Sequence, residues 1–205
     1  MKGNSSALHH FKVVIIGNTA VGKSSLLKLY QKNEVDLQTQ STLGSDFFMV
    51  PETVDGQSMK LIIWDTAGQE RYRAMTTNNL KNSKGVVVVY SIADRKSFED
   101  VERWIDDVVG SCSNYALVLI GNKTDLIDQR VVSYEEGKML AQKFKVPFYE
   151  TSVLFEKRGP NSVAVKDVFQ DLAKRMLQIE ESMPKEDKGK SLNSGPPAAA
   201  DGCKC

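Results

Sequence analysis

The sequence predicts an α/β fold: a doubly wound, mostly parallel six-stranded sheet with one antiparallel edge strand. Short apolar runs rich in β-branched residues alternate with amphipathic helical stretches. One pair of neighbouring runs is separated by Asp55-Gly56, a strong hairpin signal. The first run, Phe11–Ile16, stops at a glycine-rich turn that opens a helix. Because ligands of such sheets sit beyond the carboxyl ends of the strands, functional residues are expected there.

Six runs are expected to be strands. The first is almost continuously apolar, as in a central strand covered on both faces. Pro51 lies just past the second run and marks an edge strand, because proline cannot donate to a ladder. The runs are 11–16, 43–50, 58–64, 86–90, 116–120 and 147–149.

Helices are expected between these runs. A stretch with Leu26 and Leu27 on one side follows Gly22-Lys23-Ser24. Ser97 and Ser133 each precede an acidic residue by three positions, a pattern typical of a helix N-terminus. Val165–Glu181 reads as a final amphipathic helix.

Composition limits the class of protein. The chain has 205 residues, 41% of them hydrophobic, enough for one domain and a tail without disulfides or a structural metal. Its 27 basic and 26 acidic residues give a charge of +1, which offers no basic field for nucleic acid. We expect an extension at 1–10, a nucleotide-binding domain at 11–181 and a disordered linker at 182–205. Three cysteines are too few, and too badly placed, for a disulfide framework, which fits a reducing compartment. We expect no signal peptide and no membrane-spanning segment, because the longest apolar run is Val86–Tyr90.

A phosphate-binding motif follows the first strand. Gly17 to Ser24 match G-x-x-x-x-G-K-[ST], between a buried strand and a helix as the mechanism requires. Backbone N–H groups of such a loop wrap phosphates, helped by the helix dipole. Lys23 is expected to reach the β- and γ-phosphates, and Ser24 to bind Mg²⁺.

A second motif, Asp65-Thr-Ala-Gly68-Gln69, follows the second hairpin strand. Asp65 at a strand end can hold Mg²⁺, usually through water. Gly68 can offer its backbone N–H at close range, and Gln69 can orient an attacking water. Alone, this motif is only a plausible turn.

A third motif, Asn122-Lys123-Thr124-Asp125, follows the strand at 116–120. The Asp125 carboxylate can accept two hydrogen bonds, from N1–H and the 2-amino group of guanine. Adenine presents no such pair, so Asp125 favours GTP over ATP. A polar strand-to-helix turn is the plainer alternative for this motif read alone.

Together the three motifs, in this order and spacing, resemble the Ras superfamily from about residue 11 to 181. LGSDF (43–47), KLIIWDTAGQERYR (60–73) and VVYSIA (88–93) are similar to its Rab branch. The resemblance implies the P-loop small GTPase fold, bound GTP or GDP with Mg²⁺, and slow GTP hydrolysis stimulated by a partner. Implied nucleotide-binding residues are Gly17, Thr19, Ala20, Val21, Gly22, Lys23, Ser24, Ser25, Thr42, Gly68, Asn122, Lys123, Asp125, Thr151, Ser152 and Val153. Implied catalytic residues are Gln69 and Lys23, and implied Mg²⁺ ligands are Ser24, Thr42 and Asp65.

Several positions depart from the family pattern. Val35 replaces an aromatic residue that usually lies over the nucleotide, and Val153-Leu154 replaces Ala-Lys. Both changes touch the base, so we expect faster nucleotide release than in a Rab with the usual contacts. Residues 155–162 read as an extra surface loop. Thr19 stands where Ras proteins have glycine, near the hydrolysis site.

The ending Cys203-Lys-Cys205 is similar to the double-geranylgeranyl ending of Rabs. The resemblance implies a lipid-anchored monomer on the cytoplasmic face of an intracellular membrane, cycling with the cytosol in vesicle and protein transport. Its implied partners are an exchange factor, a GTPase-activating protein, a GDP-dissociation inhibitor or escort protein, and effectors.

Two other functions stay open from the residues. One is a hydrolysis-poor GTP-binding module that recruits partners without cycling; Gln69 argues against it and Thr19 leaves it open. The other is an ATP-using P-loop enzyme such as a small kinase, which Asp125 disfavours.

Overall fold

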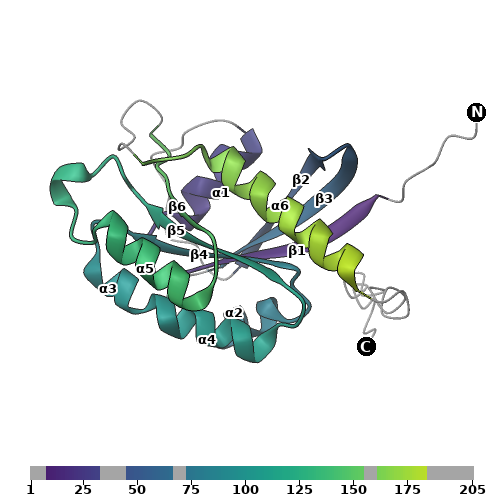
Figure 1. The fold of residues 1–205 in the computed structure, drawn as a ribbon, viewed down its shortest axis with the longest axis horizontal. Helices are drawn as coiled ribbons and strands as arrows, with labels where there is room; N and C mark the ends of the chain where they lie inside the picture. Colours follow the sequence, from purple (N-terminus) through teal and green to yellow (C-terminus); the bar gives the residue numbers. More distant parts are fainter. Residues whose placement is uncertain (1–7, 33–44, 67–72, 155–160, 184–205) are drawn as a thin grey trace, which may run out of the picture.

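The computed structural model describes residues 8–32, 45–66, 73–154 and 161–183. Its six strands form one sheet in the order β2-β3-β1-β4-β5-β6 (Figure 1). Only β2 with β3 is antiparallel, and the other neighbours are parallel, which confirms the predicted fold class. The elements are β1 (His9–Ile16), α1 (Lys23–Lys32), β2 (Ser45–Val54), β3 (Gln57–Thr66), α2 (Arg73–Leu80), β4 (Gly85–Ser91), α3 (Arg95–Glu99), α4 (Val101–Ser111), β5 (Ala116–Asn122), a 3-10 turn (Ile127–Gln129), α5 (Tyr134–Phe144), β6 (Phe148–Glu150) and α6 (Val165–Ser182).

The strand β1 is apolar on both sides because both faces of the sheet are covered. Successive side chains of a strand point to opposite faces. Val13 and Ile15 lie in one core cluster, and Val14 and Ile16 lie in another. The continuous apolar run in the sequence therefore corresponds to a strand buried on both faces, as predicted.

Two helical layers cover the sheet (Figure 1). Helices α1 and α6 pack on one face through Leu26, Leu27, Phe169 and Leu172. Helices α4 and α5 pack on the other face through Trp104, Ile105, Val108 and Ala141, joined by Leu80 of α2. The sheet is therefore packed on both faces, and the loops at the ends of its strands connect these packed elements.

The predicted hairpin joins β2 to β3. Asp55 and Gly56 have φ values of 49° and 77°, both in the left-handed region that a tight hairpin turn requires. Pro51 lies in β2, which is an edge strand of the sheet. Both hairpin strands are longer than the sequence predicted, because β2 continues through Pro51 to Val54 at the turn and β3 continues to Thr66.

One of the two predicted helix starts is confirmed. Ser133 and Glu136 form a capping box at the start of α5. The predicted start at Ser97 is wrong, because α3 begins at Arg95 and Asp94 is its N-cap. Ser97 is buried inside that helix, and its hydroxyl donates to the Asp94 carbonyl at 2.7 Å.

The parallel strands direct their carboxyl ends to one edge of the sheet, which carries the segments after Ile16, Thr66, Asn122 and Glu150. At the other end, where β1 begins, His9 Nδ1 lies 2.7 Å from Glu180 Oε2 near the end of α6. No helix among the described residues is long and apolar enough to cross a membrane.

Candidate functional site

The glycine-rich loop between β1 and α1 depends on its glycines. Gly17 and Gly22 have φ values of 139° and 100°, and Ala20 between them has 61°. A Cβ on Gly17 would lie 2.1 Å from the Val89 carbonyl oxygen, and one on Gly22 would lie 2.3 Å from Asn122 Nδ2. Larger residues therefore cannot occupy these two positions without moving β4 or β5, so the loop stays close to the sheet.

The Lys23 side chain is folded into this loop. Lys23 is 6% exposed, and its ammonium donates to the carbonyls of Gly17 at 2.9 Å and Asn18 at 2.8 Å. Burial lowers the pKa of the Lys23 ammonium to about 8, although the nearby Asp65 carboxylate works in the opposite direction. A buried cation held by neutral carbonyls is well placed to gain from an anionic ligand.

Ser24 and Asp65 bring two oxygen ligands together. Ser24 lies in the first turn of α1 and Asp65 near the end of β3, and the Ser24 hydroxyl donates to Asp65 Oδ2 at 2.5 Å. Asp65 is 2% exposed. Hydroxyl and carboxylate oxygens are the ligands that Mg²⁺ prefers, so this donor set fits the predicted metal.

Asn122 ties the sheet to the phosphate loop. Its Nδ2 donates to the carbonyl of Val21 at 2.7 Å, across 101 residues of sequence. Its Oδ1 is buried and has no hydrogen-bond partner within the described part of the chain. Lys123 follows in a left-handed conformation with φ of 67°, and its Cε is 4.0 Å from where a Gly22 Cβ would be. These two residues therefore support the loop, a role that the motif alone did not reveal.

Asp125 and Ser152 meet although 27 residues separate them. The Ser152 hydroxyl donates to Asp125 Oδ1 and accepts from the Leu154 N–H at 3.0 Å. The Thr124 N–H donates to the Thr151 carbonyl at 3.2 Å, which joins the two loops a second time. The structure thus brings together Asp125, which the third motif assigned to guanine, and Ser152, which the resemblance listed among the nucleotide-binding residues.

A buried ion pair supports the loop at 151–153, and the sequence did not predict it. Arg130 donates to Glu150 Oε1 at 2.6 Å and to Oε2 at 2.8 Å, and Glu150 is 1% exposed. The Glu150 carbonyl also accepts from the N–H of Val163, which returns the chain after the extra loop. Val153 is partly buried against the core cluster of α1 and α6.

Other predicted residues lie outside the described ranges: Val35, Thr42, Gly68, Gln69, most of the loop at 155–162, and the tail with Cys203 and Cys205. Thr19 and Ala20 lie exposed at the tip of the phosphate loop. Every other predicted site residue lies at the carboxyl edge of the sheet.

Comparison with known proteins identifies the family. The model of the Ras family matches residues 12–178. The chain belongs to the Ras family. Its relatives include GTP-binding protein YPT1 of Saccharomyces cerevisiae, 40% identical over 91% of each chain. They also include two Arabidopsis thaliana proteins, Ras-related protein RABA5d and Ras-related protein RABA5c. Each is 41% identical over 82% of this chain, and the match covers 78% and 79% of their own lengths.

Membership settles the activity that the sequence predicted. This Ras-family protein is a Rab-like small GTPase, a switch that binds GTP or GDP and hydrolyses GTP in intracellular vesicle trafficking. It works on intracellular membranes with regulators and effectors. The Asp125–Ser152 contact lies where guanine selection was expected.

Proposed function

We propose that this Rab-like switch binds its nucleotide as a Mg²⁺ complex, with phosphates in the loop from Gly17 to Ser25 and guanine between the 122–125 and 151–153 loops. The observation that carries the proposal is the convergence at one sheet edge of a buried ammonium, Lys23, and two side-chain contacts, Ser24–Asp65 and Ser152–Asp125. The cation matches the phosphates, and the Asp125 carboxylate matches the donors of guanine.

The loop and Lys23 bind the phosphates in this proposal. Backbone N–H groups of the loop and the first turn of α1 donate to phosphate oxygens, and the dipole of α1 adds a partial positive charge. Lys23 exchanges neutral carbonyls for the β- and γ-phosphates. Its ammonium then stabilises the charge that develops between them during hydrolysis.

Ser24 and Asp65, together with Thr42, are the proposed residues that hold Mg²⁺. The contact between the first two supports this assignment, and the family resemblance supports Thr42. When bound, Mg²⁺ neutralises negative charge on the β- and γ-phosphates.

Asp125 selects the base by accepting from N1–H and the 2-amino group of guanine. The Ser152 hydroxyl holds one of its oxygens, which reduces the side-chain freedom lost on binding. Backbone N–H groups of Ser152 and Val153 are the proposed donors to the guanine oxygen. The Thr151 N–H instead donates to the Gly121 carbonyl at 2.9 Å, which holds this loop against the end of β5.

Gln69 orients the attacking water, and Thr42 and Gly68 sense the γ-phosphate, as the resemblance implies. Loss of the γ-phosphate releases both backbone contacts and changes the surface offered to effectors. Intrinsic hydrolysis is slow in this proposal, because no basic side chain stands at the loop tip of Thr19 and Ala20. A GTPase-activating protein supplies the missing cation.

Geranylgeranyl groups on Cys203 and Cys205 are the proposed membrane anchor, on the cytoplasmic face. An exchange factor, effectors, and a GDP-dissociation inhibitor or escort protein are the further partners. The α6 helix ends beside the start of β1, at the opposite end of the sheet from the phosphate loop. A tail leaving from α6 would keep the site accessible to these partners.

Binding of fluorescent GDP and GTP to the full chain, with and without Mg²⁺, tests the proposal. We expect tight binding that ATP cannot displace and that weakens when Mg²⁺ is chelated. Ser24→Asn should weaken GTP binding more than GDP binding, because it alters a proposed Mg²⁺ ligand, and that Mg²⁺ lies beside the γ-phosphate, which only GTP carries. Equal affinities for ATP and GTP would contradict the base assignment, and no response to Mg²⁺ would contradict the metal ligands.

A further inference from the structure

The Asn18 side chain connects the phosphate loop to the helical layer. Asn18 is the second residue of the loop, and its Nδ2 donates to Asp100 Oδ2 at 2.8 Å. Its Oδ1 accepts from Trp104 Nε1, also at 2.8 Å. Both polar ends of the amide are therefore occupied, and the two partners fix its orientation.

Both partners are themselves held in place. Trp104 is 3% exposed and packs in the core between α4 and the sheet. Asp100 occupies the N-cap position of α4, where an aspartate usually caps the helix, yet its side chain makes no capping hydrogen bond. Its carboxylate instead contacts Asn18 and Lys96, the latter at 3.2 Å. Burial works to raise the pKa of Asp100, but the hydrogen bonds from Asn18 and Lys96, together with the positive charges of Arg103 and Lys96, lower the pKa overall.

The backbone of Asn18 reaches the phosphate-binding lysine. Lys23 Nζ donates to the Asn18 carbonyl at 2.8 Å and to the Gly17 carbonyl at 2.9 Å. One residue thus joins the start of α4, through its side chain, to the ammonium of Lys23, through its carbonyl.

We propose that Asn18, Asp100 and Trp104, here called the Asn18 cluster, position the phosphate loop and Lys23 for the β-phosphate. The three act as positioning residues, since none of them contacts the nucleotide in this proposal. The inference rests on the proposed placement of the phosphates beside Lys23.

This role separates phosphate binding from base binding. The base is assigned to Asp125 and the 151–153 loop, and none of the contacts of the Asn18 cluster reaches either. Loss of the cluster should lower the affinity for nucleotides that carry a β-phosphate. It should leave the affinity for GMP unchanged, because GMP has no β-phosphate. A general loss of stability would weaken GDP and GMP alike, so the ratio of the two affinities identifies the role.

The test uses the full chain with Asn18→Ala, Trp104→Phe and the double variant. GDP and GMP affinities are measured by displacement of fluorescent GDP. We expect Asn18→Ala to weaken GDP about five- to tenfold, the effect of losing hydrogen bonds to anchored partners. Trp104→Phe removes the indole donor and makes a buried ring smaller, but it leaves the contact between Asn18 and Asp100. It should therefore change the ratio of GDP to GMP affinity less than Asn18→Ala does. The double variant should be no weaker than Asn18→Ala, because that change already removes the contact.

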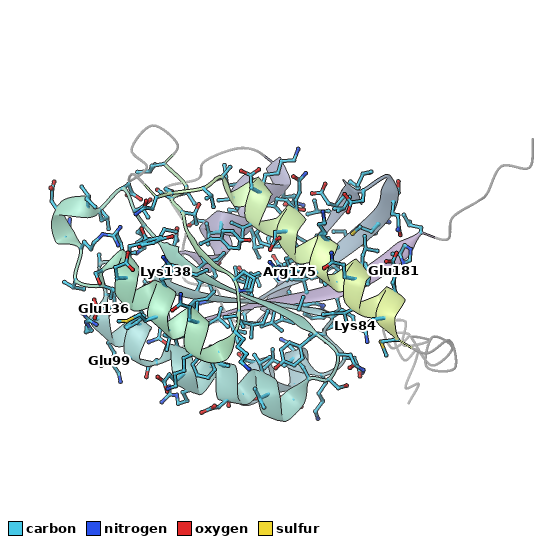
Figure 2. All side chains as sticks on the ribbon, viewed as in Figure 1. Lys84, Glu99, Glu136, Lys138, Arg175 and Glu181 are labelled. Carbon is cyan, nitrogen blue, oxygen red and sulfur yellow. The ribbon has the colours of Figure 1, made fainter. Side chains whose placement is uncertain are left out.

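A matched control comes from the other end of the sheet. Gln57 at the start of β3 donates its amide to Glu181 Oε1 at 3.1 Å. Figure 2 shows Glu181 at the end of α6, near the start of β1. Gln57→Ala thus removes an amide-to-carboxylate contact between distant elements, as Asn18→Ala does, but should leave both nucleotide affinities unchanged.

A spectroscopic readout adds an independent check. The chain has two tryptophans, so its indole N–H region holds two resonances, and Trp104→Phe assigns one of them. GDP binding should shift the Trp104 resonance in the native chain, and Asn18→Ala should reduce that shift. Absence of a shift in the native chain would overturn the inference.

The outcomes distinguish this inference from the proposed function. Equal weakening of GDP and GMP by Asn18→Ala, or additive effects in the double variant, would overturn the role of the Asn18 cluster. If Lys23→Ala lowers the affinity for GDP but Asn18→Ala does not, the positioning role of the Asn18 cluster is wrong, while the proposed phosphate site is supported. If Lys23→Ala leaves GDP affinity unchanged, the placement of the β-phosphate fails and the inference fails with it.

Discussion

Lys23 and Asp125 carry opposite charges, one at each end of the proposed nucleotide. The Lys23 ammonium is buried against two carbonyls, and its pKa is lowered to about 8 chiefly by burial. The Asp125 carboxylate accepts from the hydroxyl of Ser152. Each side chain is thus held in position before the ligand arrives, which lowers the conformational entropy lost on binding.

Asp125→Asn should change the base that the protein selects. An amide presents one donor and one acceptor, so it no longer matches the two donors of guanine. We expect GDP affinity to fall roughly 100-fold or more, since two hydrogen bonds to a charged acceptor are lost. Xanthosine diphosphate, with a carbonyl in place of the 2-amino group, should bind the variant better than the native chain. Asp128→Asn, at an exposed carboxylate three residues further on, is the control. Unchanged GDP affinity in Asp125→Asn would remove this residue from base recognition.

Motifs predicted the site residues that lie next to each other in sequence, such as Lys23 and Ser24. The resemblance also assigned distant residues, such as Ser24 and Asp65, to one metal site, but neither it nor the motifs predicted the contacts that support the site from outside the motifs. Asn18 meets Trp104 across 86 residues, and Arg130 meets Glu150 across 20. No local pattern marks such pairs, because their proximity depends on the order of strands and on helix packing.

At the scale of elements, burial and turn chemistry made most of the fold predictable. The run before Gly17 became β1, and the turn at Asp55-Gly56 became the hairpin. The pattern at Ser97 gave a wrong helix start because a serine with a following acid is not unique to N-caps. Here the Ser97 hydroxyl accepts from the Ser91 N–H at 3.0 Å, a contact that tertiary packing decides.

Two helical glycines should respond in opposite directions to alanine. A Cβ on Gly110 in α4 would have no atom within 4 Å, so Gly110→Ala should stabilise the protein by about 1 kcal/mol through helix propensity. A Cβ on Gly137 in α5 would lie 2.4 Å from Phe148 Cζ and 2.5 Å from the Tyr90 hydroxyl. Tyr90 is fully buried and cannot move aside, so Gly137→Ala should destabilise by about 1–3 kcal/mol. Denaturant unfolding of both variants checks this, and stabilisation by both would contradict the packing at α5.

The capping box of α5 should make stability depend on pH. Figure 2 shows Glu136 on this helix, and its carboxylate contacts Arg95 Nη1 at 2.6 Å and the Ser133 N–H at 2.9 Å. The hydrogen bond from Arg95, followed by those from Ser133, lowers the pKa of Glu136 from 4.5 to about 2. A carboxyl with a lowered folded pKa stabilises the fold above pH 4.5 and loses that contribution between pH 4.5 and 2.

Glu136→Gln should therefore flatten the acid side of the stability curve. Glutamine keeps a capping acceptor but does not titrate. The free energy of unfolding, measured by denaturant between pH 2 and 5, should fall less steeply in the variant than in the native chain. Equal slopes would mean that Glu136 is not the titrating group. Glu102→Gln is the control, because the Glu102 carboxylate forms an exposed salt bridge in which Lys143 Nζ lies 2.7 Å from Glu102 Oε2.

At the scale of the whole molecule, the fold places the proposed nucleotide site far from the end of α6. The proposed nucleotide site lies where the parallel strands end, whereas β1 begins and α6 ends at the opposite end of the sheet (Figure 1). There His9 of β1 contacts Glu180 of α6. A Rab-like switch must expose its nucleotide-dependent surface to partners while it stays near a membrane. Attachment through a tail beyond α6 meets both needs.

The membrane anchor is expected to need two lipid chains. One chain gives only marginal, reversible membrane binding, so a stable anchor takes a second signal. A polybasic patch cannot supply it, because Lys185, Lys188, Lys190 and Lys204 are offset by Glu186, Asp187 and Asp201. Two geranylgeranyl chains, one on each cysteine, are therefore expected.

Mass spectrometry of protein from its native cells should find both lipids, and membrane fractionation should follow them. Cys203→Ser or Cys205→Ser alone should leave partial, reversible attachment, and the double variant should move to the soluble fraction. Cys112→Ser is the matched control, because this cysteine is half-buried at the end of α4 and its thiol donates to the Leu80 carbonyl at 3.0 Å. It should leave membrane attachment unchanged. A tail without lipid, or a double variant that stays on membranes, would show that another element of the protein or a partner holds it there.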